Sequence, residues 1–307
     1  MSSTLVTGAS GFLGSAVISR LLRAEREVVG LDPVPSPRAT WCHVVDDLSD
    51  RHRLIDLLRK KAVTHVIHCG GVSGPMVLAD DPAAVIDINV TGSINLLQAA
   101  LECAAKTFLH CSSVSAVGNF YEMAEIDVNY PLRPTNTYGC SKAAMDMVLR
   151  GLWKRVPIDL CVLRFTSIYG PGRRTSLIVD EIVAASRRGA SVTVEPTTDW
   201  PYIYIDDAAD AVVAACFSDR RQQLFYFITY PEQVSLQQFE AAAVESGGLP
   251  IQIVVDDRRA KVARGPLDIS AAQRDFGFAP KVDYRLGIRC MIEAQRNTPA
   301  GGDGVVG

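Results

Sequence analysis

The segment Val6–Val17, "VTGASGFLGSAV", decides how this chain folds. It places Gly8, Gly11 and Gly14 at a G-x-x-G-x-x-G spacing, after an apolar β-branched run and at the start of a helical pattern, 12–24. Glycines at such a junction permit a tight turn and let backbone N–H groups approach a pyrophosphate at the positive end of the helix. The spacing alone is weak, but its place between a first strand and a first helix indicates a dinucleotide-binding domain.

Strand-like and helical segments alternate beyond this motif. The expected strands are 3–9, 27–32, 41–47, 64–71, 106–116 and 158–167, and the expected helices are 12–24, 50–61, 82–104 and 138–154. Nearly continuous apolar strands that alternate with helices indicate a parallel sheet covered on both faces. Right-handed crossovers then give a doubly wound α/β fold of the Rossmann type.

After residue 165 the alternation loosens, which indicates a second and smaller unit. We expect a cofactor-binding Rossmann domain over 1–165, with 203–230 returning to it, a small C-terminal substrate-binding lobe built from 166–202 and 231–296, and a flexible tail over 297–307. The tail, "NTPAGGDGVVG", has no core-forming pattern.

The composition is that of an ordinary globular protein, with 48% hydrophobic and 21% charged residues among 307. The formal net charge is −3, the pI is about 6.0 and there is no run of Lys or Arg, so we expect no nucleic acid and no anionic membrane surface as partner. The N-terminus lacks a signal-peptide pattern and no stretch of 18 residues is continuously apolar. The sequence therefore predicts a cytoplasmic protein without a membrane span.

Eight cysteines are present, and none forms a C-x-x-C pair. Several, including Cys111 and Cys161, lie in apolar strand-like runs. We expect free thiols in a reducing compartment, and no metal site, because no His/Cys cluster has ligand spacing.

An acidic residue, Asp32, ends the second expected strand, 18 residues after Gly14. A carboxylate there accepts hydrogen bonds from the adenosine ribose hydroxyls and repels a 2′-phosphate; Arg38 is the nearest arginine, across two prolines, so NAD is expected rather than NADP. The alternative role of Asp32 is to cap the turn. Asp47 and Leu48 could frame the adenine, although Asp47 could equally be the N-cap of the next helix.

The run "TNTYGCSKAAMD" places Tyr138 four residues before Lys142. On a helix these side chains share one face, and an ammonium group stabilises a neighbouring phenolate, which is the arrangement of a general base and its activator. The lysine can also hold the nicotinamide ribose. The run 110–118, "HCSSVSAVG", supplies hydroxyls at the end of the fifth expected strand, the edge where ligands of such sheets bind.

Together these motifs resemble those of the extended short-chain dehydrogenase/reductases of the NAD-dependent epimerase/dehydratase family. The matching stretches, in order, are "TGASGFLG" (7–14), "DDLSD" (46–50), "NVTGSINLLQAA" (89–100), "SSVSAVG" (112–118), "YGCSKAAMD" (138–146), "LRFTSIYGPG" (163–172), "YIYIDDAADA" (202–211) and "SAAQRDFGFAPKV" (270–282). The set is specific for the family and much less so for the substrate.

The resemblance implies roles at individual positions. Tyr138 becomes the catalytic base, Lys142 its activator and Ser113 the catalytic serine, with Ser112 or Ser115 able to share that last role. The implied cofactor contacts are Gly8, Gly11, Phe12, Leu13, Gly14, Asp32, Asp47, Leu48, Tyr138 and Lys142. The alternative for Ser113 is a hydroxyl that only ends a strand.

The sequence departs from family members that act on nucleotide sugars. They usually carry Asn at the position of Ser167 and Arg-Asp-Phe at 200–202, side chains that serve the substrate diphosphate, and a tryptophan at 200 cannot replace a guanidinium fork. The usual tyrosine is Val117 here, and the missing Asp-Glu pair disfavours 4,6-dehydration. The Gly70–Gly71 pair resembles family dehydrogenases that act on free sugar acids or small polyols.

We therefore expect an NAD-dependent oxidoreductase acting on a small carbohydrate-like substrate. The predicted substrate contacts are Ser73, Ser115, Ser167, Arg173 and Trp200. Arg173 and Arg174 could instead be a solvated pair, and Trp200 could pack the lobe. Two other functions stay open, a nucleotide-sugar epimerase with tightly held NAD and a non-catalytic nicotinamide-sensing protein. Large apolar faces on 83–104 and 138–154, together with the family resemblance, predict a homodimer through four helices.

Overall fold

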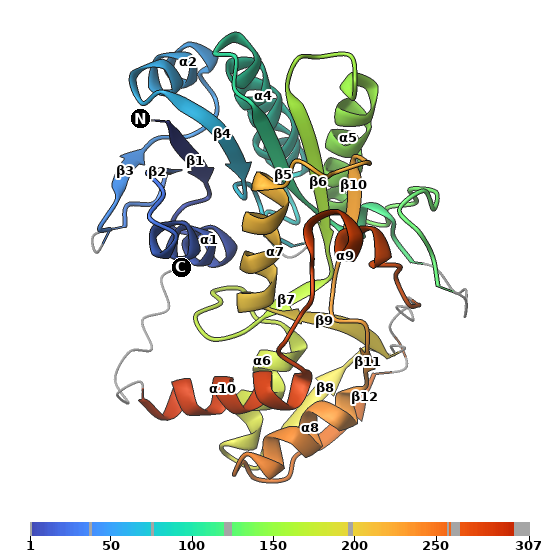
Figure 1. The fold of residues 1–307 in the computed structure, drawn as a ribbon. Coiled ribbons are helices and arrows are strands. Elements are labelled where there is room, and N and C mark those ends of the chain that lie inside the picture. The colour runs from blue at the N-terminus through green and yellow to red at the C-terminus, as the bar shows by residue number, and fades with distance from the viewer. Residues whose placement is uncertain are drawn as a thin grey trace.

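The computed structural model describes residues 2–36, 39–74, 77–119, 125–195, 199–256, 258 and 265–297. Its central sheet contains β1 (Ser3–Thr7), β2 (Val28–Asp32), β3 (Cys42–Val45), β4 (Val63–His68), β5 (Thr107–Ser113), β6 (Asp159–Phe165) and β10 (Phe225–Ile228). The strands pair in parallel in the order β10-β6-β5-β4-β1-β2-β3 (Figure 1). The predicted doubly wound α/β fold is confirmed.

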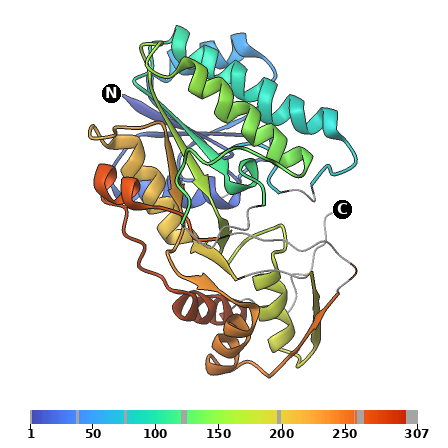
Figure 2. The same cartoon turned by 90° about the vertical axis from the view of Figure 1, so that its right-hand side faces the viewer.

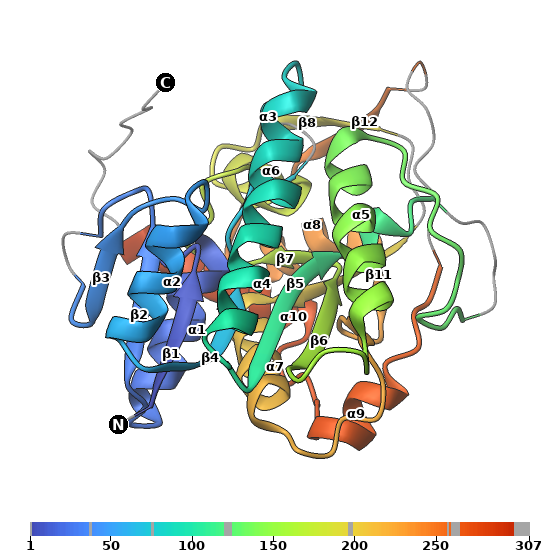
Figure 3. The same ribbon diagram turned by 90° about the horizontal axis from the view of Figure 1, so that it is seen from above.

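The central strands are apolar on both faces because each face carries its own core. Leu5 and Phe108 point into one cluster of buried side chains, whereas their chain neighbours Val6 and Leu109 point into the other. Helices α2 (Arg51–Lys60), α4 (Gly92–Glu102) and α5 (Thr137–Leu152) cover the first face, and α1 (Phe12–Arg23), α7 (Ile205–Phe217) and α9 (Ser270–Phe276) the second (Figures 1 and 3).

The strand order reverses between β1 and β4, because the chain runs outward through β2 and β3 and then returns to build β4, β5 and β6. Ligands of open α/β sheets bind at the carboxyl ends of the strands next to this reversal. Those ends carry the glycine motif after β1 and the Gly70–Gly71 pair after β4. The fold therefore places the site where these two loops meet.

A smaller lobe lies beyond the carboxyl ends of the strands (Figures 1 and 2). It contains β7 (Ser167–Tyr169), β9 (Trp200–Tyr204) and β11 (Gln233–Val234) in one sheet, β8 (Ser191–Val194) paired with β12 (Gln252–Val255), and helices α6 (Ile178–Ser186), α8 (Leu236–Glu245) and α10 (Tyr284–Asn297). Buried Phe239 anchors its core through edge contacts with Tyr169, Tyr202 and Tyr284. Strand β10 and helix α7 pack with the main sheet, and the predicted tail from 298 onward lies outside the described residues.

The expected continuous helix over 82–104 differs from the structure. In the structure, this segment consists of α3 (Pro82–Ile86), a π-helical turn η1 (Asp87–Thr91) and α4. A π turn holds one residue more than an α turn and is frequent at functional sites. Here it contains Asn89, whose side chain is buried and hydrogen-bonded outside the helix.

The same helical run, 82–102, bears on the expectation that the chain has no membrane span. Over Pro82–Glu102 it is long and apolar enough to cross a bilayer, by length and composition alone. Core helices of globular domains can be equally long and apolar, and this one is partly buried inside the fold. Its position on the sheet beside α2 and α5 accounts for its apolar character (Figure 3).

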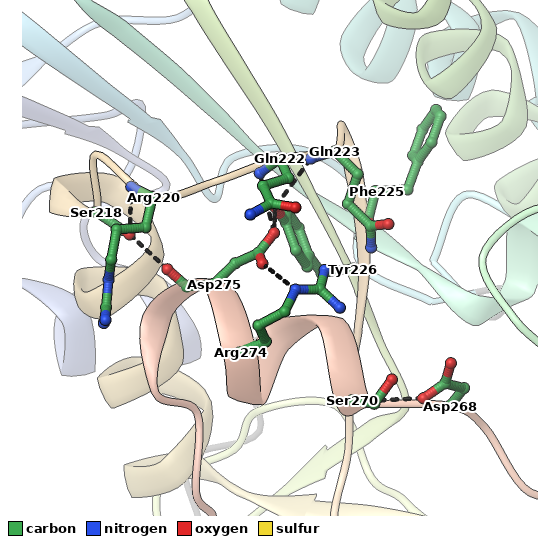
Figure 4. Close-up of polar contacts among 10 residues, drawn as sticks. All are labelled: Ser218, Arg220, Gln222, Gln223, Phe225, Tyr226, Asp268, Ser270, Arg274 and Asp275. Carbon is green, nitrogen blue, oxygen red and sulfur yellow. Dashed lines mark hydrogen bonds and ion pairs between the residues drawn. The ribbon is translucent and has the colours of Figure 1, made fainter.

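A buried carboxylate fastens the C-terminal segment to the main sheet (Figure 4). Asp275 on α9 accepts hydrogen bonds from the Tyr226 hydroxyl at 2.7 Å, the Gln222 N–H at 3.0 Å and the Arg274 Nε at 2.8 Å. Burial raises the pKa of Asp275, but these hydrogen bonds outweigh burial and leave its pKa below the usual value. The carboxylate thereby links α9 to the segment that leads into β10.

We expect Asp275→Ala to lower the free energy of unfolding by about 3 kcal/mol, because Tyr226 and the Gln222 N–H lose their buried acceptor. Because the folded-state pKa is lowered, the carboxylate stabilises the protein fully above the unfolded pKa of about 3.9, and this contribution is lost as the pH falls through the lower folded-state pKa. Urea unfolding at neutral pH and at a series of lower pH values measures both effects.

The matched control is Asp268→Ala, which removes a half-exposed carboxylate that accepts only the Ser270 N–H in the same view (Figure 4). It is expected to cost less than 1 kcal/mol. Equal losses for the two variants at neutral pH would contradict the role of Asp275, and so would a difference between them that does not shrink at all as the pH is lowered below about 3.9.

Candidate functional site

The glycine motif forms a loop that only glycine can close. Gly8 has φ +66°, and a Cβ on it would lie 2.8 Å from the Gly70 backbone; a Cβ on Gly14 would lie 2.0 Å from the Gly8 carbonyl oxygen. The N-cap of α1 is Gly11, which offers no side-chain cap, and the first turn carries no acidic residue. The N–H groups of Phe12 and Leu13 are thus at an uncapped helix N-terminus, which fits a pyrophosphate.

Asp32 fills one of the two roles that the sequence left open, the capping of the turn, and keeps capacity for the other. Its carboxylate accepts the Val34 N–H at 2.8 Å and the Ser10 N–H at 3.1 Å, so it does cap the turn and also ties that turn to the glycine motif. A carboxylate accepts about four hydrogen bonds, which leaves capacity for ribose hydroxyls. Arg38 lies outside the described residues.

Asp47 is not the cap of α2. The N-cap is Asp50, which accepts from the N–H groups of His52 and Arg53, so the alternative role given to Asp47 is wrong. Asp47 instead accepts the Ser49 hydroxyl at 2.6 Å and the Ser49 N–H at 2.8 Å, and these bonds lower its pKa. The half-buried Leu48 packs against Gly92 of α4. Both stay predicted adenine contacts.

Tyr138 and Lys142 lie on the first turns of α5. The Lys142 Nζ is buried, donates to the Cys111 carbonyl of β5 at 3.1 Å and lies 5.9 Å from the centre of the Tyr138 ring. Asn136 caps the helix by accepting the Gly139 N–H at 2.8 Å. The cation is therefore held beside the phenol by the strand that also carries Ser113.

Ser113 ends β5, directly beneath the start of α5. Its Oγ accepts the Ser115 N–H at 3.1 Å, and a Cβ on Gly139 would lie 2.4 Å from the Ser115 carbonyl oxygen. This close approach packs the first turn of α5 against the serine turn, the short helical turn Val114–Ala116 that follows β5. The Ser115 N–H uses one lone pair of the Ser113 hydroxyl and leaves its O–H group free to donate. No acceptor for this O–H is found among the described residues, so it is available to a substrate oxygen.

The buried Asn89 joins three parts of the site, and sequence reasoning missed it. Its Oδ1 accepts the Val72 N–H at 2.7 Å, its Nδ2 donates to the Ser141 Oγ at 2.9 Å, and Ser141 in turn donates to the Tyr138 carbonyl at 2.7 Å. Gly71, at φ +126°, has no room for a Cβ because Asn89 Oδ1 would lie 2.5 Å away. Asn89 is one of three amides in the helical pattern 82–104, so the sequence carried only a weak signal for it.

A second set of buried hydrogen bonds, also missed, runs behind the same loops. Ser93 Oγ donates to the Asn89 carbonyl at 2.7 Å, so it must accept from His68 Nε2 at 2.7 Å. His68 Nδ1 is then an acceptor, and Thr7 Oγ1 donates to it at 2.6 Å while accepting the Gly70 N–H at 3.2 Å. Burial, with the charge of Lys142, lowers the pKa of His68 to about 3, which keeps this neutral tautomer.

The predicted substrate residues lie in different surroundings. Trp200, buried on β9, donates its Nε1–H to the Ser167 Oγ on β7 at 3.3 Å. Ser73 is exposed in the loop after β4, and Ser115 is in the serine turn. Arg173 is half-buried in the loop after β7, whereas Arg174 is exposed. The two positions that depart from the nucleotide-sugar pattern, 167 and 200, are therefore in direct contact.

The fold and the glycine loop define a dinucleotide-binding protein of the Rossmann type. The chain belongs to the NAD dependent epimerase/dehydratase family, whose model matches residues 4–224. This membership makes it an NAD-dependent enzyme of the extended short-chain dehydrogenase/reductase type, as the motifs predicted.

Similar proteins extend over nearly the whole chain. A UDP-glucose 4-epimerase of Mycolicibacterium smegmatis is 26% identical over 310 residues, which cover 96% of this chain and 98% of that protein. A dTDP-glucose 4,6-dehydratase of Streptomyces antibioticus is 26% identical over 316 residues, 96% of this chain and 93% of the relative. The crystal structure of the Thermus thermophilus UDP-glucose 4-epimerase in complex with NAD superposes with a TM-score of 0.84 at 26% identity, covering 97% and 99% of the two chains.

We predict that Gly14→Ala abolishes NAD binding, because the new Cβ would meet the Gly8 carbonyl at 2.0 Å and open the loop. Isothermal titration with NAD measures the loss. Gly151→Ala is the control, since nothing lies within 4 Å of a Cβ at that helical position. It should bind NAD normally and unfold at slightly higher temperature, as alanine favours a helix over glycine by about 1 kcal/mol. Normal NAD affinity in Gly14→Ala would show that the loop is not the pyrophosphate site.

Proposed function

We propose that this protein is an oxidoreductase that transfers hydride between NAD and a secondary alcohol or ketone of a small carbohydrate-like substrate. The observation that carries the proposal is the contact between Trp200 and Ser167. At these positions, family members that act on nucleotide sugars usually present Arg-Asp-Phe and asparagine side chains to a diphosphate. Here an indole and a hydroxyl satisfy each other, which favours a substrate without a nucleoside diphosphate.

The side chains of the site divide the chemistry among them. Bound NAD supplies the hydride acceptor. Ser113 donates its O–H to the substrate oxygen, and Tyr138 removes the hydroxyl proton as the C–H bond breaks. The ammonium of Lys142, 5.9 Å from the phenol ring and fixed by the Cys111 carbonyl, stabilises the phenolate that accepts this proton. In the reverse direction the phenol returns the proton to the ketone oxygen.

A second candidate function is nucleotide-sugar epimerisation. It is favoured by the 26% identity to UDP-glucose 4-epimerases over nearly the full length of both chains. An epimerase reduces and reoxidises its NAD within one turnover, so it gives no net NADH. The third hypothesis, a non-catalytic nicotinamide sensor, does not explain why Ser113, Tyr138 and Lys142 are all present, with the Lys142 ammonium fixed beside the Tyr138 ring.

The test is a panel of free sugar acids, polyols and UDP-sugars, incubated with the purified protein and NAD while NADH absorbance is followed. The proposal expects net NADH from a free sugar acid or polyol. Conversion of a UDP-sugar without net NADH would establish the epimerase instead. Turnover of nothing on the panel, with NAD bound, would favour the sensor.

We predict that Tyr138→Phe lowers kcat on the true substrate by at least about a thousandfold, since the proton acceptor is lost. NAD affinity should change little, because the ring stays. The control is Cys140→Ser, two residues along α5 at an exposed thiol. It should keep nearly full activity, and a Tyr138→Phe variant as active as this control would exclude the assigned base.

We also propose a homodimer formed through α3, η1 and α5. These elements lie side by side (Figure 3). Their exposed apolar side chains include Ile86, Ile88 (42% exposed) and Met147 (53% exposed). Packing against the same helices of a second copy would bury this surface and create a four-helix interface.

Light scattering should therefore give a dimeric mass for the protein and a monomeric mass for Met147→Glu. The control is Leu249→Glu, which changes an equally exposed side chain (52%) on the small lobe, away from these helices. A monomeric mass of the unaltered protein would refute the interface, as would a dimer that persists in Met147→Glu.

A further inference from the structure

Arg173 is a cation held rigidly at the edge of the cofactor site. It lies in the loop between β7 and α6, where its Nε donates to the Thr175 carbonyl at 2.7 Å and its Nη1 to the Ile168 carbonyl at 3.0 Å. Two carbonyls from opposite sides of the loop therefore orient one guanidinium. Its Nη2 edge has no partner among the described residues, and no carboxylate lies within 4.0 Å of it there.

The guanidinium is directed toward the glycine motif. Its central carbon lies 5.8 Å from the centre of the Phe12 ring. Phe12 is the first residue of α1, and side chains at that position lean toward the N-terminus of their helix. A group against this ring is consequently beside the helix end at which the pyrophosphate binds.

The electrostatic surroundings agree with this position. Burial lowers the pKa of Arg173, while the negative charges of Asp180 and of an ionised Tyr138 act in the opposite direction. Asp180 accepts the Leu177 N–H at 2.8 Å and forms no ion pair with Arg173 within 4.0 Å. A half-buried guanidinium with spare donors and no close counterion is best satisfied by an anionic ligand.

A side-chain cation at this place would strengthen the binding of the dinucleotide. Its pyrophosphate carries two negative charges, and the glycine motif offers only backbone N–H groups and the partial charge of a helix end. The nearby Lys142 is committed to the Cys111 carbonyl and the Tyr138 phenol. Within the described part of the chain, Arg173 is the side-chain cation placed against Phe12.

We propose that Arg173 binds the pyrophosphate of NAD from the side opposite the glycine loop, and so clamps the cofactor between the main domain and the β7–α6 loop. The sequence had assigned Arg173 to the substrate. The geometry points first to the cofactor, because the guanidinium faces the start of α1. The inference concerns NAD binding and does not depend on which substrate the enzyme uses.

The test compares the binding of NAD, ADP-ribose and adenosine to the unaltered protein and to Arg173→Gln by isothermal titration. ADP-ribose retains the pyrophosphate without nicotinamide, and adenosine has no phosphate. Loss of charge-assisted hydrogen bonds should weaken NAD and ADP-ribose by the same factor, about ten- to a hundredfold, and leave adenosine unchanged. Arg173→Lys, which keeps the charge without the fork, should fall in between.

Arg174→Gln is the matched control, since it makes the same charge change at the adjacent exposed residue and should bind NAD normally. Thermal unfolding without ligand verifies that both variants are folded. Unchanged ADP-ribose affinity in Arg173→Gln would overturn the proposal, whether or not NAD binding changes, and would return Arg173 to the nicotinamide or the substrate. Equal weakening of adenosine would overturn it too, because it would show a displaced loop rather than a lost phosphate contact.

Discussion

The site depends on one close approach, that of the Gly8 backbone to the Gly70 backbone. A Cβ on Gly8 would lie 2.8 Å from Gly70, so the loops after β1 and β4 touch without side chains between them. This contact is at the reversal of strand order, where the two halves of the sheet diverge. It places the loop after β1, which is expected to hold the pyrophosphate, directly against the loop after β4, which continues toward the substrate side.

The surrounding polar groups keep these loops in register. Thr7 accepts the Gly70 N–H and donates to His68, and Asn89 holds Val72 on one side and Ser141 of α5 on the other. The bonds of Thr7 to His68 and of Asn89 to Val72 and Ser141 are buried, and a buried hydrogen bond left unmade costs more than a made one contributes. The cofactor loop, the substrate loop and the catalytic helix are therefore parts of one network, and displacement of any one leaves buried donors unsatisfied in the others.

Sequence patterns predicted what depends on short-range repetition. The central strands could be found because they are apolar on both faces. Tyr138, Lys142 and the three glycines could be found because their spacing has a direct geometric meaning. The π turn was not predictable, since 82–104 reads as one regular helix, and its buried Asn89 gives only a weak signal. The sequence offered Asp47 as one possible cap of α2 and missed Asp50, because both residues closely precede the helical pattern. The contact of Trp200 with Ser167 joins residues 33 positions apart and follows only from the pairing of β7 with β9.

The π turn makes the helix over 82–102 unusual with respect to insertions and deletions. Removing one residue from 87–91 would restore ordinary α-helical hydrogen bonding, and by local backbone energetics alone it would be an improvement. The deletion would also rotate the side chains before the deleted residue by about 100° relative to those after it. Either the Asn89 carboxamide would then move away from Val72, or the apolar face of α4 would turn away from the sheet. The number of residues in this helix is thus fixed by the contacts of Asn89 in the site and not by helical hydrogen bonding. Natural variation here should therefore occur by substitution and not by gain or loss of residues.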